Sequence, residues 1–176
     1  MDKLVACIVE GTAERVIITK LLDNDKLKFS RNELLDEELL RSRTARKFEE
    51  KYLGKSFKSK IIVYRILDSK NEGFKLRKTY ASKVDVINVI TAPEIEILVI
   101  LKEGKFDDYC KYKSRLKPSE YCSQVLRIPK VKNEDFLEKY FSDVQELENV
   151  IKEYKSKHKF LKGELCLADI LKDNSV

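Results

Sequence analysis

The chain has 176 residues, of which 43% are hydrophobic and 38% are charged, so it is long enough for one domain with a sizeable core. With only 5 glycines and 3 prolines, the composition excludes a linker or a disordered tail and favours a helix-rich fold. The net charge of +6 favours polyanions such as nucleic acid as partners, and the longest apolar run, residues 95–101, is too short to span a membrane.

The cysteines are scattered along the chain at Cys7, Cys110, Cys122 and Cys166, without any C-x₂-C spacing. This distribution predicts free thiols and argues against a zinc site. We therefore expect a cytoplasmic protein that does not associate with membranes.

The first predicted element is a buried strand over residues 4–9, where the apolar run is rich in β-branched side chains. Glu10 follows this strand, at the carboxyl end where open α/β sheets bind their ligands. Gly11 permits a sharp turn, Thr12 is placed to cap the next helix, and Glu14 lies in its first turn. A carboxylate at a strand tip suits Mg²⁺, although many ordinary strands also end in this way.

A helical pattern over residues 33–53 follows a turn and a short predicted strand at 27–29, and Gly54 closes it. Its middle carries Arg41, Arg43 and Arg46. These arginines are candidates for binding phosphate, but a solvated helix face explains the same pattern.

The second convincing strand is Lys60–Leu67, which ends on Asp68. Parallel strands joined by helices bring their carboxyl ends to one edge of the sheet, so Glu10 and Asp68 are expected to share a cation if their strands are neighbours. The alternative is that Asp68 caps a predicted helix at residues 74–80 or holds the loop before it.

A third strand is predicted over Val84–Ile90, and the apolar helix Glu94–Glu103 follows it. Glu94 fits the first turn of that helix. Glu96 lies inside an otherwise apolar stretch, where a buried carboxylate is costly unless it is paired or bound to metal.

The remaining chain is predicted to be helical over residues 117–126, 133–141 and 144–158, with a short helix at 165–171. Before these helices, tyrosines alternate with Lys111, Lys113 and Arg115, a combination that can bind nucleic acid by stacking bases and neutralising phosphates. Tyrosines packing under lysine stems explain the same pattern. No Walker loop and no G-x-G-x-x-G motif occurs.

Together these motifs resemble the Toprim domain: Val9-Glu10-Gly11-Thr12-Ala13-Glu14 after a strand, Asp68 after a later strand, and Pro93-Glu94-Ile95-Glu96 before an apolar helix. The resemblance is to the nuclease half of OLD (overcoming-lysogenization-defect) nucleases and to RloB-like stand-alone Toprim proteins. It implies an α/β fold, with a Toprim-like, mainly parallel sheet flanked by helices over residues 1–104. Residues 105–176 are then expected to form a helical extension packed on that core.

The same resemblance implies a Mg²⁺ or Mn²⁺ site that supports phosphodiester cleavage or transfer. Glu10 and Asp68 would be its first and second acids, with Glu14 as an additional helix acid. The implied function is that of a metal-dependent nuclease or related phosphoryl-transfer protein acting on DNA or RNA, in a bacterial or phage conflict system.

Further ligands are implied at Glu94 and Glu96, which match an acidic segment of RloB-like members. The chain departs from the family at Lys70, which stands where the second acid of Asp-x-Asp belongs. Either Glu72 substitutes for that acid or one metal site is lost, and Lys70 is then a candidate for neutralising the substrate phosphate.

Two alternatives remain open at this point. The first is a catalytically degenerate Toprim-like module that binds nucleic acid or a partner protein such as a defence ATPase. The second is an ordinary α/β protein in which these acids only cap helices and hold turns.

Overall fold

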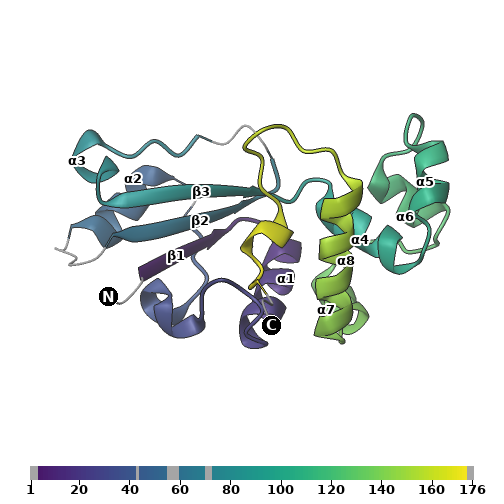
Figure 1. Cartoon of the computed structure of the whole chain (residues 1–176), viewed down its shortest axis with the longest axis horizontal. Coiled ribbons are helices and arrows are strands. Elements are labelled where there is room, and N and C mark those ends of the chain that lie inside the picture. The colour runs from purple at the N-terminus through teal and green to yellow at the C-terminus, as the bar shows by residue number, and fades with distance from the viewer. Residues whose placement is uncertain (1–3, 43, 55–59, 70–72, 174–176) are drawn as a thin grey trace.

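A parallel sheet forms the centre of the molecule in the computed structural model, which describes residues 4–42, 44–54, 60–69 and 73–173 (Figure 1). Within these residues the sheet has three strands in the order β1 (Leu4–Val9), β2 (Ile61–Leu67) and β3 (Val84–Ile90). Val9 of β1 is opposite Ile66, and Ile66 is opposite Val89. The carboxyl ends of all three strands therefore meet at one edge.

Both faces of β1 and β2 are buried, which is why these two strands are nearly continuous apolar runs, whereas β3 exposes Asp85 and Asn88. On one face, Cys7 and Ile66 pack in a large cluster with α1 (Thr12–Asp23). On the other face, Ile8 and Val63 pack beneath α2 (Ala45–Phe48) and the π-helical turn that continues it, Glu49–Leu53. The predicted α/β architecture, a parallel sheet flanked by helices, is confirmed.

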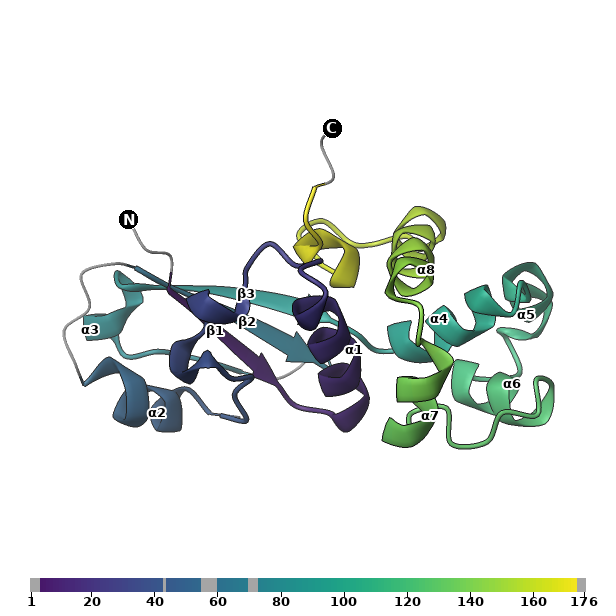
Figure 2. The ribbon, with the colours of Figure 1, turned by 90° about the horizontal axis from the view of Figure 1, so that it is seen from below.

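Helix α4 (Glu94–Lys102) extends away from the carboxyl end of β3, and the later helices gather around it (Figures 1 and 2). The helix α8 (Val144–Lys157) packs on α4, and α7 (Glu134–Tyr140) packs on α1. The helices α5 (Phe106–Tyr112) and α6 (Pro118–Gln124) lie at the end of the molecule that is remote from the sheet. No helix in the described part of the chain is both long and apolar enough to cross a membrane.

The last described segment returns to the sheet. Leu165 forms a parallel bridge with Val89, and Leu171 forms an antiparallel bridge with Leu27. Between them, residues Leu167–Ile170 form a 3₁₀ turn. Residues after 105 thus contribute side chains to the same hydrophobic cluster as the sheet, and the domain boundary at 104 stays a prediction.

The predicted helix over residues 33–53 is wrong in its first half. Residues 31–37 form two short 3₁₀ turns, Arg31–Glu33 and Leu35–Glu37, and an extended segment follows. The reason is that β1 needs a neighbour at its open edge. Leu40 supplies it, because its N–H donates to the Cys7 carbonyl at 2.8 Å and its carbonyl accepts from the Val9 N–H at 3.0 Å.

Three smaller expectations are also corrected. The helix predicted at 74–80 is reduced to α3 (Lys78–Ala81), because Phe74 and Leu76 pack on the sheet in extended backbone. The N-cap of α1 is Gly11 rather than Thr12. The short strand predicted at 27–29 is only a single bridge. The four cysteines are free, as predicted.

Candidate functional site

Acidic side chains from three elements converge at the carboxyl edge of the sheet, on the face covered by α1. Glu14 comes from the first turn of α1, Asp68 follows β2, and Glu96 comes from the first turn of α4. Lys132, from the loop before α7, reaches the same place. We call this group, together with Thr91, the acid–lysine cluster; its members are Glu14, Asp68, Thr91, Glu96 and Lys132.

Lys132 is the link between two of these carboxylates. Its Nζ lies 3.0 Å from Oδ1 of Asp68 and 3.6 Å from Oε1 of Glu96. The other carboxylate oxygen of Glu96, Oε2, is buried and has no hydrogen-bond partner among the described residues. A buried carboxylate oxygen without a partner is costly, so this atom is available to a further cation or donor.

Glu14 is held in place by its own helix and by the residue after β3. Its side chain is 2% exposed, and its Oε1 lies 3.4 Å from the Thr91 hydroxyl, which is also 3.0 Å from the Leu67 carbonyl. The carboxylate folds back over Gly11, where an added Cβ would come within 1.8 Å of Oε2. Gly11 has φ −92°, which any residue can adopt, so the glycine is required for this close approach and not for the turn.

The electrostatics of the acid–lysine cluster oppose full ionisation. Burial raises the pKa of Glu14, and the neighbouring Asp68 raises it further. Burial likewise raises the pKa of Glu96, against the opposing effect of Lys132. Burial tends to lower the pKa of Lys132, but Glu96, Asp68 and Glu14 outweigh it and raise that pKa. Lys132 therefore stays positively charged, but its single charge does not neutralise the three carboxylates around it.

Glu10 lies on the other face of the sheet. Its Oε1 is 3.6 Å from Nη2 of Arg65, a side chain that is only 1% exposed. The Arg65 guanidinium donates to Oδ1 of Asn88 at 3.3 Å and lies 4.7 Å from the centre of the Phe74 ring. Glu10 thus faces a buried arginine that packs on one aromatic ring.

Glu10 and Asp68, the two acids predicted to share a cation, therefore lie at the same edge of the sheet but contact different side chains. The parallel pairing of β1 with β2 confirms the common edge. Side chains alternate along a strand, however, so Glu10 continues the face of Ile8, whereas Asp68 continues the face of Ile66. The structure brings Asp68 together with Glu14 and Glu96, and it does not bring Glu10 into that group.

Glu94 and Glu96 are two positions apart in α4, so they point to opposite sides of the helix. Glu94 is fully buried, and its Oε2 accepts a hydrogen bond from the Leu167 N–H at 3.3 Å. Burial raises its pKa well above the ordinary value, and Oε1 has no hydrogen-bond partner in the described part of the chain. Glu94 therefore faces the C-terminal 3₁₀ turn and is separate from the acid–lysine cluster.

Lys70 and Glu72 lie outside the described residues, so their predicted roles are not addressed by the geometry. Within the described ranges, no group of three or more His, Cys, Asp or Glu side chains is arranged to hold a metal ion. In the acid–lysine cluster, the Lys132 ammonium lies where carboxylates from different elements approach one another.

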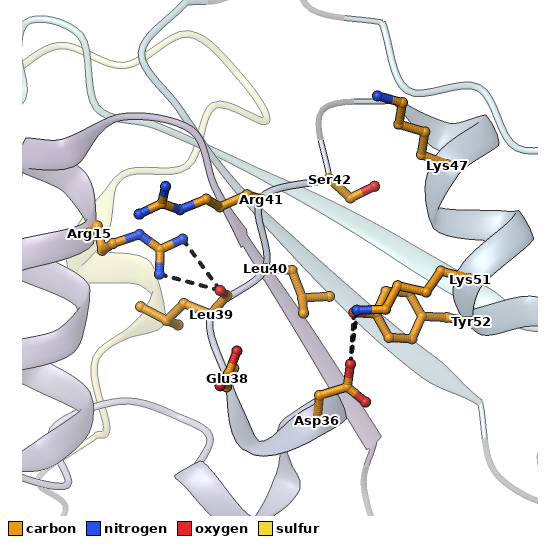
Figure 3. Close-up of a pocket in the computed structure, with 10 residues that line it drawn as sticks. All are labelled: Arg15, Asp36, Glu38, Leu39, Leu40, Arg41, Ser42, Lys47, Lys51 and Tyr52. Carbon is orange, nitrogen blue, oxygen red and sulfur yellow. Dashed lines mark hydrogen bonds and ion pairs between the residues drawn. The ribbon is translucent and has the colours of Figure 1, made fainter.

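The predicted arginine stripe is not formed, because residues 38–42 are not helical. Arg46 is exposed on α2 and pairs with Glu50 at 2.8 Å, and Arg43 lies outside the described residues. Arg41 instead shares two adjoining hollows, of about 550 and 240 Å³, with Arg15 of α1 (Figure 3). We call the two hollows together the arginine groove. Its walls are Val9–Thr12, Arg15, Asp36, Glu38–Ser42, Lys47, Lys51 and Tyr52.

The other predicted basic surface lies on α5 and the loop after it, at the far end of the molecule (Figure 1). Lys113 and Arg115 are exposed, and Lys111 is 3.5 Å from the Asp108 carboxylate. Of the nearby tyrosines, Tyr109 and Tyr121 are buried against each other with ring centres 5.2 Å apart, whereas Tyr112 is exposed.

Sequence reasoning missed Lys132, Thr91, Arg65 and Arg15. Arg65 carried a signal, because a charged residue inside an apolar strand needs a partner. Thr91 directly follows β3, the same position relative to its strand that singled out Glu10 and Asp68. Lys132 is one lysine among many in a loop, and no local pattern distinguishes it.

Comparison with protein-family models, with curated proteins and with solved structures finds no match to this chain.

Proposed function

We propose that the chain is a metal-dependent nuclease or related phosphoryl-transfer protein acting on nucleic acid. The observation that supports this most is the convergence of Glu14, Asp68 and Glu96, from three separate elements, at the carboxyl edge of a parallel sheet. Ligands of open α/β sheets bind at this edge. The Toprim resemblance, including the implied setting of a bacterial or phage conflict system, is part of the same proposal.

The chemistry of these donors, rather than their present arrangement, suits a hard divalent cation. All three side chains offer only oxygen, the ligand type preferred by Mg²⁺ and Mn²⁺. The partnerless Oε2 of Glu96 and the raised pKa values of Glu14 and Glu96 indicate a cluster that lacks positive charge. When bound, such a cation would supply Lewis-acid stabilisation of the phosphoryl group and a more acidic water.

The protein's own groups have distinct roles in this proposal. Thr91 orients the Glu14 carboxylate through its hydroxyl, and Gly11 leaves room for that carboxylate. The side chain of Lys132 is 36% exposed, so its ammonium can also approach a phosphate and neutralise the charge that develops there.

The test is calorimetric titration with Mn²⁺, paired with a cleavage assay on labelled DNA and RNA. We expect wild type to bind Mn²⁺ and to cleave, and Glu14→Gln, Asp68→Asn and Glu96→Gln each to lose binding and cleavage. Glu134→Gln, an exposed acid in the first turn of α7, serves as the control. Unchanged Mn²⁺ binding in all three variants would contradict the proposal.

The second candidate is a module without chemistry that binds nucleic acid or a partner protein such as a defence ATPase. The position of the Lys132 ammonium, 3.0 Å from Asp68, favours it, because an internal cation can take the place of a metal. Absence of Mn²⁺ binding in wild type, together with its appearance in Lys132→Met, would favour this candidate over the nuclease.

A further inference from the structure

We propose that Arg15 and Arg41 form a phosphate-binding site in the arginine groove and that this groove binds the phosphodiester backbone of nucleic acid. The inference deepens the proposed function, because it assigns the contact to the substrate backbone. It depends on that function only for the choice of nucleic acid as the ligand.

The fold brings the two arginines together from different elements. Arg15 lies on the first turns of α1, and both of its terminal nitrogens donate to the Leu39 carbonyl at 3.3 Å. Leu40 pairs with Ile8 beside β1, so Arg41 emerges level with the end of that strand. Figure 3 shows both guanidinium groups reaching into the same space.

The charges in the arginine groove are not balanced. Burial lowers the pKa of Arg15, and the nearby Arg41 lowers it further, as expected for two like charges in proximity. No ion pair joins either guanidinium to a carboxylate in the described ranges. Asp36 in the wall is engaged by Lys51 at 3.2 Å and by the Tyr52 hydroxyl at 3.0 Å, and Glu10 faces Arg65. Glu38 and Glu134 raise the pKa of Arg15, but each by less than Arg41 lowers it.

A bound anion would relieve the repulsion between the two arginines. Guanidinium groups present several donors in a plane and match phosphate oxygens, so phosphate fits better than a halide or a single carboxylate. Lys47 lines the larger hollow beyond Arg41, and Arg15 and Arg41 also line the smaller one. Cations distributed over two hollows suit successive phosphates of a strand better than one isolated phosphate.

The backbone of residues 36–37 has an unusual conformation that determines the position of Arg41. Asp36 and Glu37 both have positive φ, 56° and 54°, a conformation that residues other than glycine rarely adopt. These two residues redirect the chain so that residues 38–41 run along β1. Strained positions of this kind concentrate at sites of function, and here they fix where Arg41 emerges.

The experiment is fluorescence anisotropy with labelled single-stranded DNA and RNA, in EDTA, at several salt concentrations. We expect wild type to bind and Arg41→Gln to bind about fivefold more weakly, with its salt slope reduced by about 0.7 to 1. Arg31→Gln is the matched control, because it removes the same charge from the same segment, where Arg31 pairs with Asp23. Arg41 is exposed and has no ion pair in the described part of the chain, so we expect its substitution to leave the fold intact.

An equal effect of Arg31→Gln and Arg41→Gln would overturn the site, as would the absence of binding by wild type. A loss confined to Arg115→Gln would assign binding to the α5 surface and would also overturn the proposal. Competition by inorganic phosphate, without binding of any oligonucleotide, would indicate a site for free phosphate and would contradict the choice of ligand. Because binding is measured in EDTA, its outcome does not depend on the metal site, which separates this inference from failure of the proposed cleavage.

Discussion

The ammonium group of Lys132 lies 3.0 Å from the carboxylate of Asp68, although 64 residues separate the two in the chain. Asp68 follows β2, whereas Lys132 comes from the loop before α7, which packs on α1. The contact therefore ties the carboxyl edge of the sheet to the C-terminal helices. It also supplies one positive charge to a group of three carboxylates.

Replacing Lys132 with methionine is expected to increase the affinity for Mn²⁺. The reason is that one competing unit charge within about 4 Å of the ligands is removed, which is worth about tenfold or more in affinity. Calorimetric titration measures this change, with Lys139→Met on α7 as the control. An unchanged affinity would show that the ammonium does not compete with the ion.

Gly11→Ala is expected to displace the Glu14 carboxylate, because the new methyl group would lie 1.8 Å from its present Oε2 position. The backbone at Gly11 accommodates alanine, so the melting temperature should change little. We expect Mn²⁺ affinity to fall by about tenfold, as for other changes that misorient a ligand. An unchanged Mn²⁺ affinity in Gly11→Ala would show that the close approach at Gly11 does not position Glu14.

Glu94→Gln is expected to make stability less dependent on pH. Burial raises the pKa of folded Glu94 well above the value of 4.5 for an exposed glutamate. Its stabilisation is therefore complete below pH 4.5 and is lost as the pH rises through the raised pKa. In urea unfolding between about pH 5 and about pH 8, the free energy of unfolding of the variant should increase relative to that of wild type as the pH rises. An exposed control, Glu134→Gln, should show no such trend.

Arg65→Met is expected to destabilise the protein by about 3 kcal/mol, because it removes the charge that faces the largely buried Glu10 carboxylate. Chemical denaturation measures this loss directly. Adding Glu10→Gln to the same chain should recover part of the stability, since the remaining side chain is then uncharged. If the double variant is as unstable as the sum of its two single variants, the two side chains do not interact.

Much of the fold could be predicted because its signals are local. The strand Val84–Ile90 and the helix Val144–Lys157 match the expected segments almost residue for residue. Buried strands carry continuous β-branched runs, and α8 is capped by Asp143, whose side chain accepts from the Gln145 N–H at 2.8 Å. The acids at the carboxyl edge of the sheet followed from the same reasoning.

The failures have a common physical cause, which is contact between distant segments. Leu34, Leu35, Leu39 and Leu40 are compatible with a helix, but Leu34 and Leu40 pair with the edge of β1 instead. Tertiary hydrogen bonding outweighs helix propensity there. Glu10 and Asp68 point to opposite faces of the sheet because of where each strand ends relative to its alternating side chains. The position of Lys132 depends on how α7 packs on the rest of the fold.

The pairing of Leu171 with Leu27 has a consequence for biosynthesis. Residues 26–28 leave the ribosome early, yet Lys28 N–H donates to the Ile170 carbonyl and Lys172 N–H donates to the Lys26 carbonyl, at 2.9 and 2.8 Å. The nascent chain must therefore carry an incompletely covered apolar surface until translation has passed residue 172. Assembly of this fold is thus complete only after residues 170–172 have been made, and chaperones are most relevant to it before that point.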